Sequence, residues 1–166
     1  MEMEYAGIDE ALALVAKHFR GMTDKDGEPY VMHCLRVMMG CRESDAQLVG
    51  LMHDLVEDTS VTLADLRSQG FTDEVVAAVD LVTHKSGDSY AEYVVSIKSN
   101  PLAREAKLSD LRDNFSINRV LYREPVRERD LLRMQRYVLS YQYLSDRLDE
   151  TSYRRNMARV EDVSAS

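Results

Sequence analysis

Long apolar runs, proline and glycine are all scarce in this 166-residue sequence, and each scarcity argues against a class of protein. No apolar run approaches the roughly 20 residues that a membrane-spanning helix needs. Residues 1–4 are acidic where a secretory signal peptide would be basic. We therefore expect no membrane association. Three prolines and seven glycines, with 45% hydrophobic residues, favour one helix-rich soluble domain over a sheet sandwich.

Cysteine is also rare, since Cys34 and Cys41 are the only two in the sequence. They lie seven residues apart in one predicted helix, or about two turns, which is too far for a disulfide bond. We therefore predict reduced thiols and a cytoplasmic protein.

Basic charge is sparse in the first part of the chain. Residues 1–100 carry 18 acidic and 8 Lys or Arg side chains, whereas residues 101–166 carry 11 and 13. Nothing here is typical of the basic footprint of a nucleic-acid-binding protein, so we expect no nucleic acid partner. An anionic substrate would need a metal ion and a few local cations to offset the acidic half. The alternative is a solvated acidic surface without a ligand.

Apolar residues recur at helical spacing through most of the chain, and no segment alternates as a strand would. We therefore predict an all-α, single-domain helical bundle over residues 1–150. Residues 151–166 lack a periodic apolar face and are predicted to be a loose tail. Thr62 is a good N-cap, and Gly40 and Gly70 are predicted helix ends. The predicted helices span residues 9–19, 30–39, 46–59, 63–69, 73–82, 89–97, 101–115 and 126–148.

One short run of polar residues ends an apolar stretch, and it reads HDLVEDT at residues 53–59. In a helix, His53 and Glu57 would share one face, and Asp54 and Asp58 would lie together beside them. Burying so many polar groups among apolar neighbours is costly unless a partner satisfies them, and a cation would do so. An adjacent His-Asp pair alone also occurs as a helix cap on a surface.

Two more potential ligands, His33 and Asp110, lie far from this run in the sequence. Two imidazoles and two carboxylates, from His33, His53, Asp54 and Asp110, are typical of a six-coordinate divalent ion with water in its open positions. They differ from the thiolate or imidazole tetrahedron of structural zinc. Alternatively, His33 is a hydrogen-bonded core histidine and Asp110 pairs with a nearby arginine.

Further polar side chains flank these residues. Glu57 and Asp58 could orient or deprotonate a water beside the metal, or could simply support its ligands. Asn114 lies four residues after Asp110 in one predicted helix, so the two share a face, and Asn114 could contact substrate there. The alternative for Asn114 is an exposed amide. His18 and His84 lack a comparable motif and are predicted surface residues.

Three segments of the sequence together resemble a known family. Residues 27–33 read GEPYVMH, residues 53–59 read HDLVEDT, and residues 107–114 read KLSDLRDN. They are similar to the GxPYxxHP, HDxxEDT and KLADxxxN motifs of the HD-domain phosphohydrolases. The resemblance is closest to the (p)ppGpp hydrolase domain of the RelA/SpoT stringent-response proteins and their small stand-alone relatives, and it covers residues 7–148.

The resemblance implies an all-α, metal-dependent enzyme that removes the 3′-pyrophosphate from (p)ppGpp, a small nucleotide. It implies a manganese ion (Mn²⁺) held by four side chains, those of His33, His53, Asp54 and Asp110. It further implies that the attacking water is activated by Glu57 and Asp58, and that the nucleotide sugar or the metal shell is contacted by Asn114.

The sequence departs from the family pattern at three places, one of which is an early His-x-Gly-Gln segment that reads FRGM at residues 19–22. The proline that follows the metal-binding histidine is Cys34 here. An Arg-Lys-Ser stretch that helps to hold the guanine nucleotide corresponds to Asp24, Lys25 and Asp26, which puts acids beside a polyphosphate. Lys25 is a predicted phosphate contact, with an exposed loop lysine as the alternative.

Two other functions therefore stay open beside (p)ppGpp hydrolysis. One is an HD-type phosphatase acting on another nucleotide, such as a deoxynucleoside monophosphate or NADPH. The other is a non-catalytic sensor that holds a nucleotide at a bound metal. The sequence does not specify an oligomeric state.

Overall fold

The computed structural model describes residues 5–116 and 128–164, and these residues form helices and connecting loops without a strand. This confirms the all-α prediction. None of the described helices has the length and apolar character that crossing a membrane would require. In chain order, the helices are α1 (Ile8–His18), α2 (Tyr30–Met39), α3 (Ser44–Met52), α4 (Leu55–Asp58), α5 (Leu63–Ser68), α6 (Asp73–Val82), α7 (Tyr90–Ile97), α8 (Pro101–Asn114), α9 (Glu128–Leu144) and α10 (Glu150–Ser164).

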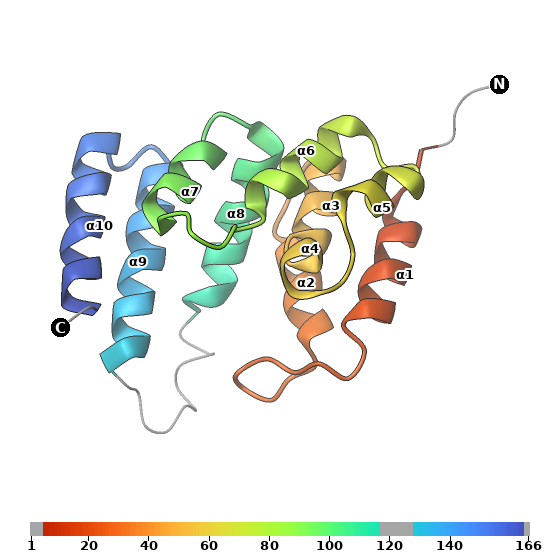
Figure 1. Ribbon diagram of the computed structural model, residues 1–166, viewed down its shortest axis with the longest axis horizontal. Helices are drawn as coiled ribbons and strands as arrows, with labels where there is room; N and C mark the ends of the chain where they lie inside the picture. The colour runs from red at the N-terminus through yellow and green to blue at the C-terminus, as the bar shows by residue number, and fades with distance from the viewer. Residues whose placement is uncertain (1–4, 117–127, 165–166) are drawn as a thin grey trace.

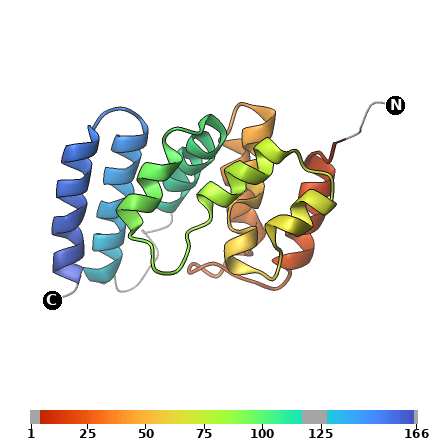
Figure 2. The same ribbon diagram turned by 45° about the horizontal axis from the view of Figure 1, so that its top comes forward.

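The molecule is elongated, with α1 and α5 near one end and α9 and α10 at the other (Figure 1). Figure 2 shows the same arrangement from a second direction. Helix α3 packs against both α2 and α8, and α9 packs between α8 and α10. The central trio of α2, α3 and α8 therefore carries the segments in which the sequence places the candidate ligands.

Helix α3 is the centre of the core because it is apolar on nearly every side. Six of its nine residues are buried, among them Val49, Leu51 and Met52, none of which is exposed at all. A helix that is apolar all round must be enclosed by other elements rather than lie on a surface. The residues that follow α3 are consequently delivered into the interior.

Two glycines let these helices approach closely. A Cβ atom on Gly40 would lie 2.1 Å from the Ser109 hydroxyl of α8, and one on Gly50 would lie 3.2 Å from the Cys41 sulfur. Ser109 also donates a hydrogen bond to the carbonyl of Val37 at 2.7 Å. Glycine at both positions thus lets α2 pack directly against α3 and α8.

Capping residues define several helix boundaries as predicted. The hydroxyl of Thr62 accepts a hydrogen bond from the backbone of Asp65, and the Asp65 carboxylate accepts one from the backbone of Thr62 in return. Pro101 occupies the first turn of α8. Helix α2 spans the predicted residues, and Gly40 is its C-cap. Helix α9 is shorter than predicted, and residues 126 and 127 lie outside the described residues.

The prediction of one continuous helix over residues 46–59 is wrong. The chain leaves α3 after Met52 and begins α4 at Leu55. The backbone of Asp54 (φ −99°, ψ −1°) lies outside the usual α-helical range. The imidazole of His53 forms a hydrogen bond with the Gly50 carbonyl at 2.8 Å, next to this break. His53 and Asp54 therefore project from a tight turn rather than from a helical face.

The predicted loose tail is wrong over residues 151–164, because residues 150–164 form α10, and residues 165 and 166 lie outside the described residues. Tyr153 and Met157 are completely buried, and Val160 is 4% exposed. These side chains recur at helical spacing and form a narrow apolar stripe, which is sufficient for a helix packed on one side only. Helix α10 is therefore part of the folded structure.

Candidate metal centre

The break between α3 and α4 brings together side chains from three separate segments. His33 lies in α2, Asp110 in α8, and His53 and Asp54 lie in the break itself. The two imidazole Nε2 atoms are 3.2 Å apart. Asp110 Oδ1 lies 3.3 Å from His33 Nε2 and 3.6 Å from His53 Nε2. Asp54 Oδ2 lies 2.8 Å from His53 Nε2 and 3.8 Å from His33 Nε2.

Hydrogen bonds at the outer nitrogens fix the tautomers of both histidines. The Gly50 carbonyl can only accept, so His53 Nδ1 donates to it. His33 Nδ1 contacts Asp113 Oδ2 at 2.6 Å, and an ionised carboxylate likewise requires a donor. In the neutral rings, both Nε2 lone pairs therefore point to one place. Two lone pairs and two carboxylates that converge repel each other unless positive charge lies between them.

A divalent cation fits this arrangement. Atoms that bind one ion at about 2.0–2.2 Å lie roughly 3–3.5 Å apart at bond angles of about 90–110°. The separations from 2.8 to 3.8 Å span that range. His33, His53 and Asp54 form a group that could hold a metal ion among the described residues. His33 and Asp110 are 3% exposed and His53 is 2% exposed, so the group is deep enough to exclude most solvent.

The pKa values show how strongly these groups interact. Burial disfavours the imidazolium of His53, but the carboxylates of Asp54 and Asp110 outweigh it and raise its pKa well above the usual value. Burial likewise opposes ionisation of Asp110, yet the ammonium of Lys107 and the two histidines hold its pKa well below the usual value. The cluster therefore attracts positive charge, whether protons or a cation, and the two compete.

A cavity of about 500 Å³ opens in front of this cluster. The predicted residues Lys25, Glu57, Asp58 and Asn114 all line it. The complete lining consists of Thr23, Asp24, Lys25, Tyr30, His33, Asp54, Glu57, Asp58, His84, Tyr90, Tyr93, Lys107, Asp110, Asn114, Asp130, Arg133, Met134 and Tyr137. All eight predicted site residues therefore lie in the cluster or along the cavity.

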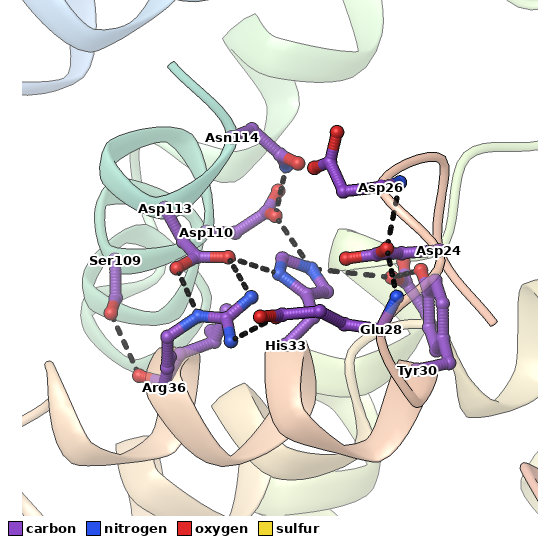
Figure 3. Close-up of polar contacts among 12 residues, drawn as sticks. Asp24, Asp26, Glu28, Tyr30, His33, Arg36, Ser109, Asp110, Asp113 and Asn114 are labelled. Atoms are coloured by element: carbon purple, nitrogen blue, oxygen red, sulfur yellow. Dashed lines mark hydrogen bonds and ion pairs between the residues drawn. The ribbon is translucent and has the colours of Figure 1, made fainter. Parts of the chain in front are cut away.

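The predicted flanking residues differ in their contacts. The Glu57 side chain is exposed overall, but its carboxylate accepts a hydrogen bond from the backbone of His84 at 2.8 Å. Burial and the nearby carboxylates of Asp54 and Asp58 raise the pKa of Glu57. Asn114 donates to Asp110 Oδ1, as Figure 3 shows.

Several side chains that carry the site were not singled out from the sequence. The Tyr30 hydroxyl donates to Asp54 Oδ2, and Lys107 Nζ donates to Asp110 Oδ2 at 2.7 Å. Tyr30 lies in the motif at residues 27–33 and Lys107 in the motif at residues 107–114. Each is three residues from a predicted ligand, and this spacing could have identified both as candidate site residues. His84, expected on the surface, is partly buried and lines the cavity.

One cavity residue, Tyr90, has an unsatisfied polar atom. Its hydroxyl is buried and has no hydrogen-bond partner within the described part of the chain. Tyr93, by contrast, packs on the His84 ring and donates its hydroxyl proton to the Val82 carbonyl. The Tyr90 hydroxyl therefore has an unused hydrogen bond next to the cavity.

The fold and site together define a helical domain of the HD type, and comparisons with known proteins agree. The sequence matches no family model. Over 130 residues it is 33% identical to a GTP pyrophosphokinase of Streptomyces coelicolor, covering 70% of this chain but 15% of that protein. Over 102 residues it is 30% identical to the guanosine-3′,5′-bis(diphosphate) 3′-pyrophosphohydrolase of Aquifex aeolicus, covering 54% of this chain and 14% of that protein.

A solved structure has the same fold. It is that of a metazoan ortholog of SpoT that hydrolyses ppGpp, and the superposition has a TM-score of 0.67 at 21% sequence identity. The similarity covers 95% of this chain and 96% of the other. The chain therefore resembles the HD-type hydrolase domains of the RelA/SpoT proteins in sequence and shares their fold. It spans only about 15% of the length of the Streptomyces relative.

Proposed function

We propose that this domain is a metal-dependent phosphohydrolase that removes pyrophosphate from (p)ppGpp or a related nucleotide. One observation carries the proposal: two imidazoles and two carboxylates from three segments converge at the base of a cavity of nucleotide size. The sequence relatives support the choice of substrate, since one of them is named as a ppGpp 3′-pyrophosphohydrolase.

In this proposal the metal ligands are His33, His53, Asp54 and Asp110. When bound, a divalent cation supplies the positive charge that polarises a phosphoryl oxygen and lowers the pKa of a nearby water. The mixed imidazole and carboxylate set is suitable for manganese, which the resemblance to the HD-domain phosphohydrolases favours. Tyr30 and Lys107 each donate a hydrogen bond to one of the carboxylates and so fix its orientation.

Glu57 and Asp58 accept the proton of the attacking water. Both line the cavity next to Asp54, and neither forms an ion pair with a Lys or Arg side chain in the described part of the chain. Burial is the main cause that raises the pKa of each carboxyl group above its usual value. A raised pKa makes a carboxylate a stronger base.

Other residues of the cavity lining would contact the substrate. Lys25 and Arg133 offer charge to phosphate oxygens, and Tyr90 offers its unpartnered hydroxyl. Asn114 holds the Asp110 carboxylate, which supports a role in the shell around the metal. Its carbonyl oxygen is the part of the amide that a sugar hydroxyl could contact.

The charge of the cavity favours a second candidate, an HD-type phosphatase for a less highly charged nucleotide. Six lining residues are acidic, whereas three are Lys or Arg. Asp24, at the position of a family arginine, is held by hydrogen bonds from the backbone of Asp26 and Glu28. Such a wall repels a tetraphosphate more than a monophosphate or NADPH.

A substrate panel tests both candidates. We expect the protein with Mn²⁺ to release pyrophosphate from ppGpp, and His53→Ala or Asp54→Ala to abolish release. His18→Ala, at a partly buried residue that does not line the cavity, is the matched control. Release of orthophosphate from a monophosphate or NADPH, but not of pyrophosphate from ppGpp, would favour the second candidate.

The non-catalytic sensor is tested in the same incubations. A nucleotide that binds tightly but is recovered intact from the wild-type protein would contradict hydrolysis of either kind. We also propose a cytoplasmic location, which is supported by two free and buried cysteines, Cys34 and Cys41.

A further inference from the structure

A chain of charged side chains extends outward from one of the proposed metal ligands. His33 Nδ1 donates to Asp113 Oδ2 at 2.6 Å. Arg36 Nε donates to Asp113 Oδ1 at 2.6 Å, and a second guanidinium nitrogen reaches Oδ2 at 3.3 Å. Glu28 accepts from the remaining side of the guanidinium at 3.2 Å. Figure 3 shows this series running from Glu28 to His33 across the gap between α2 and α8.

The geometry of Asp113 is that of a clamped side chain. Both of its oxygens are engaged by the planar fork of one arginine, which leaves the carboxylate little rotational freedom. The Asp113 side chain is 11% exposed and that of Arg36 is 35% exposed. The partly enclosed contact makes the arrangement stronger than a typical surface ion pair.

The clamp acts on the metal centre through the histidine ring. A carboxylate at Nδ1 fixes the tautomer, because the proton stays on Nδ1 and the lone pair stays on Nε2. It also makes Nε2 a stronger electron-pair donor to a cation. Hydrogen bonds of this kind to a metal ligand change metal affinity by about 10–100-fold. His53 Nδ1 donates instead to the backbone carbonyl of Gly50. The two histidines are therefore supported unequally.

We propose that Asp113 and Arg36 are positioning residues for the metal centre: Arg36 clamps Asp113, and Asp113 holds His33 in its metal-binding form. The inference rests on the metal centre of the proposed function. It goes further because it gives a role to two residues that touch neither the cation nor the substrate. Removing either should weaken cation binding without removing a ligand.

Affinity for Mn²⁺ alone, measured by competition with a chromogenic chelator, tests this without substrate. We expect Asp113→Ala to weaken Mn²⁺ binding about 10–100-fold. Asp113→Asn, which keeps an acceptor for His33 Nδ1, should lose less, and it also serves if the alanine variant does not fold. Arg36→Met should weaken binding severalfold. Arg67→Met, which breaks the exposed pair with Asp73 elsewhere, should leave affinity unchanged.

A double variant separates positioning from a general effect on the fold. In the Asp113→Ala background, Arg36→Met should have no further effect on Mn²⁺ affinity, because the clamp has nothing left to hold. Equal effects of Arg36→Met in both backgrounds, or unchanged affinity in Asp113→Ala, would overturn the inference while leaving the proposed function standing. A wild-type protein that binds no Mn²⁺ would contradict the metal centre itself.

Discussion

Tyr153 provides the sharpest test of the C-terminal half of the fold. It is completely buried between α9 and α10, its ring stacks on Tyr143 with centroids 4.7 Å apart, and its hydroxyl contacts Ser140 Oγ at 3.1 Å. Ser140 in turn donates to the Arg136 carbonyl, so its oxygen is available to accept from Tyr153. The side chain thus joins α10 to the helix that carries Arg133 and Tyr137 of the cavity wall.

The expected cost of removing this side chain can be worked out from its burial. A tyrosine buries about 200 Å², and at about 25 cal/mol per Å² this corresponds to roughly 5 kcal/mol, an upper value. Measured truncations of large aromatic side chains cost about 3–5 kcal/mol. We therefore expect Tyr153→Ala to lower the free energy of unfolding by about 3–5 kcal/mol. Tyr153→Phe loses one hydrogen bond and should cost about 1 kcal/mol.

Urea unfolding of the full chain followed by circular dichroism measures these differences. Tyr5→Ala, at a tyrosine that is 59% exposed, is the control and should change stability by less than about 0.5 kcal/mol. A loss of less than about 1 kcal/mol in Tyr153→Ala would refute the packing of α10. Such a result would instead fit the loose tail that the sequence predicted.

Two further predictions concern the cavity. Tyr90→Phe should raise KM severalfold and leave Mn²⁺ affinity unchanged, because in the proposed function the hydroxyl contacts the substrate and not the metal ligands; an unchanged KM would rule out that contact. Glu57 must be ionised to accept a proton, so kcat/KM should fall as the pH drops through its pKa, which burial raises above the usual value. Glu57→Gln should lower kcat and remove this acid limb from the pH profile, whereas a retained limb would assign it to another group.

Much of the fold could be predicted from local sequence signals. Thr62 and Gly40 define helix boundaries through short-range hydrogen bonds and backbone preferences, and these are visible in the sequence. Helix α10 was missed although Tyr153, Met157 and Val160 follow a helical period. Three apolar residues are too few to outweigh the polar composition of residues 151–166 unless the partner helix is known.

Site residues that lie within the sequence motifs could be predicted. Contacts between residues that are distant in the sequence could not. The proposed ligands His33, His53, Asp54 and Asp110 do converge, but His53 lies in a break between two helices, where its imidazole forms a hydrogen bond with the Gly50 carbonyl. Helical periodicity continues through this point, so the break could not be predicted. The clamp between Arg36 and Asp113 joins residues 77 positions apart, and no local pattern links them.

The location of a bound cation tests the central claim most directly. Crystals grown with Mn²⁺ and measured near the manganese absorption edge would show the ion by its anomalous scattering. We predict one ion per chain, within about 2.0–2.3 Å of His33 Nε2, His53 Nε2 and one oxygen each of Asp54 and Asp110. An ion bound elsewhere, or no anomalous signal at this cluster under saturating Mn²⁺, would contradict the account.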